Sequence, residues 1–78
     1  MKLMQILYET VNMTITVKTK DNVTYKGTVV EIDDYMNVVL KNVDLFDTEI
    51  TFKKDAAIRG SNVKYFILPP VLKYLRDL

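Results

Sequence analysis

The sequence predicts a mainly β protein in which one short N-terminal helix precedes a small, strongly bent antiparallel barrel of five strands. Three observations predict this class. A helical spacing of apolar residues is confined to the start of the chain, and an alternation of apolar and polar residues replaces it from residue 13 onward. Short turn-forming stretches separate the alternating segments. One segment changes phase after a glycine, which is typical of a strand that bends to close a small barrel.

The first elements are a helix, a strand and a turn. Residues 2–9, KLMQILYE, are mostly good helix formers, and their apolar residues recur at the spacing of one helical face. That face consists of Leu3, Ile6 and Leu7. Residues 13–18 alternate between apolar and polar, which predicts a half-buried strand. The dipeptide Asp21-Asn22 supplies the turn that follows.

The second expected strand, residues 23–32, carries the phase change. Its apolar alternation runs through Gly27, but Val29 and Val30 are both apolar and the pattern resumes on Ile32, one residue out of phase. A glycine on the surface would be the ordinary interpretation of Gly27. A glycine followed by a phase change instead favours a sharply bent strand.

The third and fourth strands are expected at residues 38–45 and 50–58, with a weak turn at Asp47-Thr48 between them. The third strand carries the apolar residues Val38, Val39, Leu40, Val43 and Leu45. Those of the fourth fall on even positions, namely Ile50, Phe52, Ala56 and Ile58. This spacing predicts a strand with one buried face and one exposed face.

The fifth strand, residues 63–68, is apolar on both faces. Val63, Tyr65 and Ile67 are expected on one side, and Phe66 and Leu68 on the other. Either a helix covers the outer face, or the strand lies at an edge that another subunit completes. A pair of prolines, residues 69–70, ends the strand, and residues 71–78 are spaced for a short helix or an apolar plug.

Composition excludes several classes of function. The 78 residues contain no Cys and no His, which excludes a zinc site, a thiol nucleophile and an imidazole base, so an enzyme is a poor expectation. No apolar run approaches the roughly 20 residues of a spanning helix, and we expect an intracellular, soluble protein without a membrane partner. The formal net charge of +1 means that any nucleic-acid site must be a local cluster.

Two loops carry side chains suited to binding. Residues 33–37, DDYMN, place Tyr35 and Asn37 two positions apart, and an exposed aromatic with a nearby amide is how unpaired RNA bases are usually recognised. Residues 59–62, RGSN, offer the planar cation of Arg59 together with a glycine that permits close backbone approach. Each loop taken alone is more simply a turn, because Asp, Asn, Gly and Ser are ordinary turn residues.

Taken together, the two loops carry a family resemblance over nearly the whole chain. The segments VTYKGTVVEIDDYMNVVLKNV and AAIRGSNVKYFILP combine a D-x-x-M-N pattern with I-R-G about twenty residues later. In this combination the sequence resembles the Sm/Lsm family of RNA-binding ring proteins. Within the family, the opening MKL and the ending IRGSNVKYFILP look most similar to the spliceosomal Sm D proteins, the D-one type in particular.

The resemblance implies one Sm domain over residues 1–78, with an SH3-like barrel. The first Sm motif would span about residues 13–43, the second about 56–69, and a C-terminal extension residues 70–78. It also implies a seven-membered ring with other Sm/Lsm subunits, in which the fourth strand of one subunit pairs with the fifth strand of the next. The interface residues would then be Ile58, Tyr65, Phe66 and Leu68.

The resemblance also implies roles for the loop residues. Tyr35 would stack on one uridine of a U-rich single-stranded RNA, and Asn37 would bond the edge of that base. Arg59, with Gly60 and Ser61 beside it, would close the pocket from the other side. Asp33 would orient Asn37 and the Arg59 loop without touching RNA. No catalytic residue, metal or cofactor is expected.

The leading hypothesis is therefore a non-catalytic subunit of the small nuclear ribonucleoprotein core, closed around small nuclear RNA in pre-mRNA splicing. Such a subunit would reside in the nucleus after a cytoplasmic assembly stage. Two alternatives remain. One is an Lsm-type ring that binds RNA 3′ ends in decay or maturation, and the other is a barrel that binds peptides by adding a strand to its edge.

Overall fold

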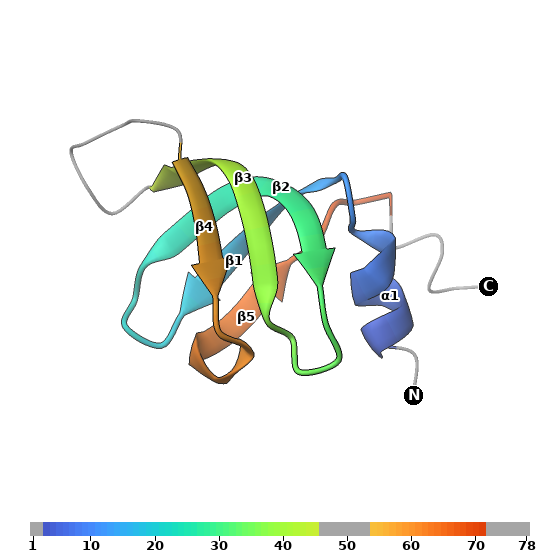
Figure 1. The fold of residues 1–78 in the computed structure, drawn as a ribbon, viewed down its shortest axis with the longest axis horizontal. Coiled ribbons are helices and arrows are strands. Elements are labelled where there is room, and N and C mark those ends of the chain that lie inside the picture. Colours follow the sequence, from blue (N-terminus) through green and yellow to red (C-terminus); the bar gives the residue numbers. More distant parts are fainter. Residues whose placement is uncertain (1–2, 46–53, 72–78) are drawn as a thin grey trace.

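The computed structural model describes residues 3–45 and 54–71 and confirms the predicted fold class (Figure 1). One helix and five strands appear in the expected order, with a single turn of 3₁₀ helix before the last strand. The elements are α1 Leu3–Glu9, β1 Thr14–Thr19, β2 Thr24–Ile32, β3 Val38–Leu45, β4 Lys54–Ile58, η1 Gly60–Asn62 and β5 Val63–Ile67. The expected turn at 47–48, the start of the fourth strand and most of the C-terminal tail lie outside the described residues.

The strands form one antiparallel sheet in the order β4-β3-β2-β1-β5. Consecutive strands are neighbours from β1 to β4, and β5 returns to pair with β1. In the described part of the chain, β4 therefore pairs only with β3, and β5 only with β1. These two strands are the edges of the described sheet.

The bend expected in the second strand is present in β2. Its pairing with β3 shifts register between Lys26 and Thr28 and again between Val29 and Glu31. Gly27 lies at the first of these irregularities and is buried. A Cβ atom on Gly27 would lie 2.9 Å from the backbone oxygen of Lys41, so the bend brings two strands closer than any larger residue allows.

The expected division of the fifth strand into two faces is partly wrong. Phe66 packs against the core, but so does Val63, while Tyr65 and Ile67 are 47% and 55% exposed. The cause is an irregularity in the pairing of β5 with β1: Thr19 faces Val63 while Lys18 faces Tyr65. One extra residue of β5 is accommodated there, and Val63 consequently changes side.

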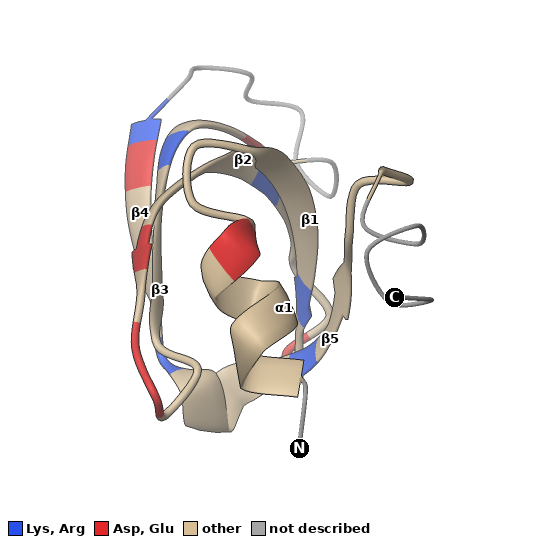
Figure 2. Ribbon diagram, turned by 90° about the vertical axis from the view of Figure 1, so that its right-hand side faces the viewer, with Lys and Arg blue, Asp and Glu red and all other residues tan. Residues whose placement is uncertain are grey.

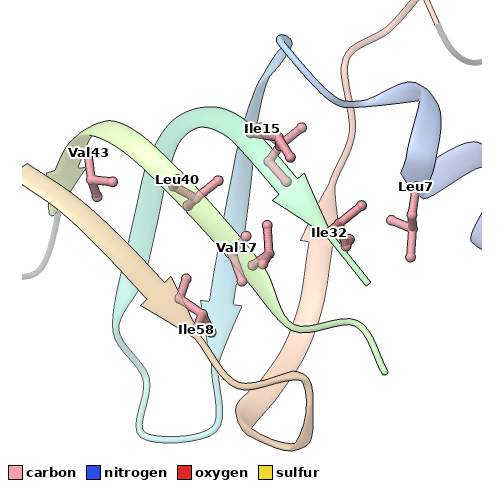
Figure 3. Close-up of a cluster of buried hydrophobic side chains, with 9 residues drawn as sticks. Leu7, Ile15, Val17, Ile32, Leu40, Val43 and Ile58 are labelled. Atoms are coloured by element: carbon pink, nitrogen blue, oxygen red, sulfur yellow. The ribbon is translucent and has the colours of Figure 1, made fainter. Parts of the chain in front are cut away.

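The core lies inside the curve of the sheet (Figure 3). Its buried apolar side chains come from α1 and from the four strands β1 to β4. They are Leu7, Ile15, Val17, Val29, Ile32, Val38, Leu40, Val43 and Ile58. Figure 2 shows α1 lying across the opening between the β3–β4 side and the β1–β5 side of the bent sheet.

The buried face of α1 differs from the predicted one. Leu7 is fully buried and Met4 packs against the core, whereas Leu3 is 38% exposed. Met4 and Leu7, three positions apart on the helix, therefore face the core, so the prediction is confirmed for Leu7 and wrong for Leu3. No helix in the described ranges is long and apolar enough to cross a bilayer.

Candidate nucleic-acid interface

The two loops singled out in the sequence lie at the same end of the sheet (Figure 1). Antiparallel pairing explains this arrangement. Val38, the first residue of β3, pairs with Ile32 at the end of β2 and with Ile58 at the end of β4. The loop after β2 begins at residue 33, and the segment after β4 begins at residue 59. The two consequently begin on either side of Val38.

The β2–β3 loop is organised around the carboxylate of Asp33. One carboxylate oxygen accepts the backbone N–H groups of Tyr35 at 2.9 Å and Asn37 at 3.0 Å. The other accepts the side-chain amide of Asn37 at 2.9 Å. The backbone closes the loop as well, because the Asp33 N–H donates to the Asn37 carbonyl at 3.1 Å. Asp33 thus binds both ends of the loop and orients the Asn37 side chain.

These hydrogen bonds lower the pKa of Asp33. The largest cause is the hydrogen bond from the Asn37 side chain, and the backbone N–H groups of Asn37 and Tyr35 act in the same direction. Desolvation opposes them without reversing the shift. Each of these donors stabilises the ionised carboxylate in preference to the neutral acid, so the folded loop favours the charged form.

Met36 adopts a backbone conformation that is uncommon for its residue type. Its φ angle is 65°, in the left-handed region, which costs a residue other than glycine on the order of 1 kcal/mol or more. Its N–H donates to the Asp33 carbonyl at 3.0 Å, and its half-buried side chain packs against the core. The turn between Asp33 and Asn37 and the core contact therefore hold Met36 in place from both sides.

Asn37 joins the two loops. Its side-chain oxygen accepts the backbone N–H of Gly60 at 2.7 Å, while its side-chain nitrogen donates to Asp33. A primary amide has two N–H donors and two acceptor lone pairs. The hydrogen bonds formed with the described residues use one of each, so one donor and one acceptor remain for a ligand in a side chain whose orientation is already set.

Gly60 is required by the closeness of the two loops. A Cβ atom built on Gly60 would lie 1.8 Å from the backbone oxygen of Tyr35 and 2.8 Å from the carbonyl carbon of Met36. Its φ angle is not positive, so the demand is for space and not for an unusual backbone conformation. The close approach that this glycine permits in the structure is that of the other loop's backbone.

Exposed side chains and a hollow lie beside this junction. Tyr35 is 82% exposed, and Arg59 is also exposed. A hollow of about 340 Å³ opens beside Arg59 and Asn37. It is lined by Glu31, Ile32, Asp33, Asn37, Val38, Val39, Ala57, Ile58 and Arg59. An aromatic ring, an amide and a guanidinium thus gather at one end of the sheet.

The structure places the predicted site residues as follows. Asp33, Tyr35, Asn37 and Gly60 are brought together by hydrogen bonds and close backbone contact, Arg59 lines the hollow with Asn37, and Ser61 is exposed on η1. Of the predicted interface residues, Tyr65 is exposed on β5 and Phe66 and Leu68 are half-buried against the core, while Ile58 is a core residue with 6% exposure. Contacts of any of these residues with RNA or another subunit stay predictions.

One contact at this site was not expected from the sequence. The hydroxyl of Tyr8, on α1, donates a hydrogen bond to the carboxylate of Asp34, next to Tyr35. This hydrogen bond is the largest cause of a raised Tyr8 pKa, followed by desolvation and by the charges of Asp34 and Asp33. The two residues are 26 positions apart, so neither helical spacing nor strand alternation could have paired them. Within the described residues no group of three or more acidic side chains gathers that could hold a metal ion.

The chain is similar to known proteins in sequence. A model of the LSM domain family matches residues 5–68. The Sm D3 small nuclear ribonucleoprotein of Schizosaccharomyces pombe is 27% identical over 71 residues, which is 88% of this chain and 73% of that protein. The U6 snRNA-associated Sm-like protein LSm6 of Neurospora crassa is 36% identical over 61 residues, covering 76% of this chain and 74% of that protein.

Solved structures share the fold. The SmAP1 heptamer of P. aerophilum matches with a TM-score of 0.80 at 21% identity, covering 90% of this chain and 96% of the other. The Sm protein of Pyrococcus abyssii, solved in complex with a uridine heptamer, matches with a TM-score of 0.72 at 21% identity, covering 82% and 93%. At such identities the likeness establishes the bent five-stranded fold.

Proposed function

The chain belongs to the LSM domain family, and from this premise we propose that it is a non-catalytic subunit of an Sm/Lsm ring that binds U-rich single-stranded RNA. The observation that carries the proposal is the position of Asn37, which joins the two loops and still has a donor and an acceptor to offer. The solved relatives that assemble as a heptamer and that hold a uridine heptamer support the ring and the ligand.

Ring formation is supported by the two edges of the sheet. Edge strands β4 and β5 are different surfaces of the same chain, and joining one to the other in successive copies is a head-to-tail contact. Such contacts close into rings when the rotation per subunit divides a full turn. Exposed Tyr65 and Ile67 on β5, next to half-buried Phe66, supply apolar side chains for the seam. Through main-chain bonds the sheet would continue from subunit to subunit.

Uridine recognition follows from what the loops leave available. The exposed ring of Tyr35 can stack on a base, and such stacking does not depend on the identity of the base. Uracil presents an N–H donor flanked by carbonyl acceptors on its pairing edge, which complements the remaining acceptor and donor of the Asn37 amide. The Arg59 guanidinium would stack on the base or contact its phosphate. One base per subunit binds weakly, so affinity depends on the assembled ring.

The narrower assignment is the small nuclear ribonucleoprotein core, in which the ring closes around small nuclear RNA for pre-mRNA splicing. Similarity to Sm D3 supports this assignment. Under it, the protein would reside in the nucleus after a cytoplasmic assembly stage. Similarity to LSm6 favours the alternative, an Lsm ring that binds RNA 3′ ends. RNA that copurifies with the chain would distinguish them, because internal U-rich sites support the first and terminal oligo-U the second.

Native mass spectrometry combined with RNA binding tests the broader proposal. The purified chain, alone and with other Sm-type subunits, should form a closed ring whose mass increases by one oligo-U strand. Fluorescence anisotropy should show tighter binding of oligo-U than of oligo-A or oligo-C of the same length. A chain that assembles but does not prefer oligo-U would refute the proposed ligand, and a chain that stays monomeric with every subunit tried would refute the ring.

A further inference from the structure

The helix α1 contacts the loop proposed to bind RNA, although the two are distant in sequence. The contact is the hydrogen bond from the Tyr8 hydroxyl to the Asp34 carboxylate. Tyr8 is 42% exposed, and Asp34 immediately precedes Tyr35 in the chain. The helix therefore holds the loop at the residue next to the one whose ring is most exposed.

The helix holds Tyr8 firmly because the C-terminal end of the helix is packed in the core and the chain after it is bonded to the sheet. Leu7, next to Tyr8, is fully buried, and the N–H of Thr10 donates to the Leu7 carbonyl at 3.0 Å. The chain after the helix is bonded to β2, since the N–H of Asn12 donates to the Val29 carbonyl at 2.8 Å. Tyr8 thus extends from a packed element toward a loop at the end of the same strand.

The loop is packed or bonded at two other points, and Gly60 lies against the backbone oxygen of Tyr35 itself. Met36 packs against the core, and Asn37 is bonded to Gly60. Both points lie after Tyr35. On the other side of Tyr35, Asp33 is bonded within the loop itself, and Asp34 is the residue that reaches another element. The contact with Tyr8 consequently completes the support of the loop around Tyr35.

We infer that Tyr8 is a positioning residue for RNA binding, which acts through Asp34 to hold the backbone that presents Tyr35. The inference rests on the proposed function, because Tyr35 is assigned to a base only there. The direction in which Asp34 should affect RNA affinity distinguishes this role. Asp34 is an anionic residue beside a site for a polyanion, so its charge alone opposes binding. The positioning role requires that Asp34 nevertheless help binding through its bond to Tyr8.

Three substitutions separate charge from positioning. Tyr8→Phe removes the hydroxyl and keeps the ring. Asp34→Asn and Asp34→Ala remove the same charge, but only the asparagine retains an oxygen that can accept the Tyr8 hydrogen bond. The two Asp34 variants therefore differ by the contact and not by electrostatics. Oligo-U affinity of each, alone and combined with Tyr8→Phe, forms a double-mutant cycle.

The expected results are as follows. Tyr8→Phe weakens oligo-U binding by about threefold or more, and Asp34→Asn binds at least about threefold more tightly than Asp34→Ala. In the Tyr8→Phe background the difference between the two Asp34 variants disappears. Ring assembly by native mass spectrometry stays unchanged throughout. If Tyr8→Phe binds as the wild type does, or if the difference between Asn and Ala persists without the hydroxyl, the inference is wrong.

A measurement without RNA distinguishes this inference from the proposed function. Amide hydrogen exchange at Tyr35 and Met36 should be several-fold faster in Tyr8→Phe, because their N–H groups are bonded within the loop that Tyr8 supports. The Asn62 N–H, bonded to the Arg59 carbonyl in the other loop, is the control and should not change. Unchanged exchange at Tyr35 overturns the positioning role. If exchange at Tyr35 is faster in Tyr8→Phe but the wild-type protein does not bind oligo-U, the contact between Tyr8 and Asp34 still supports the loop. Its role in RNA binding is then overturned.

Discussion

The side-chain oxygen of Asn37 accepts the backbone N–H of Gly60 at 2.7 Å, across 23 positions of sequence. The same side chain donates to Asp33 at 2.9 Å. One amide therefore connects the loop after β2 with the segment after β4, and the position of each loop depends on the other.

Replacing Asn37 with alanine should weaken RNA binding and leave assembly intact. The variant loses the link to Gly60, the hydrogen bond to Asp33 and the free groups of the amide. We expect oligo-U affinity to fall roughly tenfold, the size of one or two lost hydrogen bonds. Arg59→Ala, which removes the cation and leaves the Asn37 bonds in place, should also weaken binding. Anisotropy titration measures the affinity and native mass spectrometry the ring; unchanged affinity in both variants would disprove the pocket.

Replacing Gly60 with alanine should push the loops apart. The added methyl group would lie 1.8 Å from the Tyr35 carbonyl oxygen, which only a backbone shift can relieve. Overpacking of this kind typically costs about 1–3 kcal/mol of unfolding free energy, measurable by urea denaturation. Ser61→Ala, at the exposed neighbouring position, is the matched control and should change stability by no more than about 0.5 kcal/mol. Equal stability of the two variants would contradict the observed closeness.

Acidification should loosen the β2–β3 loop at low pH. The pKa of Asp33 lies below its ordinary value of 3.8, so its ionised form is favoured by folding. The stabilisation is complete above the ordinary value and is lost as the pH falls through the lowered one. Carboxyl carbon NMR should report the lowered pKa directly. In Asn37→Ala, which removes its largest cause, the Asp33 pKa should rise toward the ordinary value; an unchanged pKa would mean that the amide does not stabilise the carboxylate.

Two exposed tyrosines should behave differently when replaced. Tyr35→Ala removes a stacking ring and should cost about 1–3 kcal/mol of binding free energy per bound base, without affecting assembly. Tyr65→Ala, on edge strand β5, should weaken assembly of the subunit ring by removing apolar contact area at the proposed seam. Tyr35→Phe keeps the aromatic ring and should bind oligo-U nearly as tightly as the wild type does. If Tyr35→Ala fails to assemble, Tyr35 belongs to a subunit interface and not to the RNA site.

Much of the fold could be predicted because local periodicity reflects it. The alternation of residues 13–18 gave the first strand nearly in full, and the phase change after Gly27 located the bend, which the paired strands show as shifts of register. The two loops were also found, since turn residues combined with Tyr35 and Asn37 stand out in sequence. In each case the deciding interaction is between neighbours in the chain or on one strand.

The misses arose where the partner lies elsewhere. The buried face of α1 includes Met4 in place of Leu3, because the sheet determines which side of the helix is covered. Val63 changes side because β5 accommodates an extra residue opposite Thr19. The bond between Tyr8 and Asp34 joins a helix to a loop, and no spacing rule relates them. These features depend on tertiary geometry, which periodicity does not encode.

The different edges of the described sheet have a consequence for how a ring would be built. Every incomplete chain of subunits joined from β4 to β5 keeps one unpaired strand at each end. Unpaired strands invite other chains to add to them, which is how β proteins begin to aggregate. Closure removes both ends at once. Intermediates would therefore be the species most prone to aggregation, and the cell would gain from finishing each ring quickly or from shielding its open ends until the last subunit arrives.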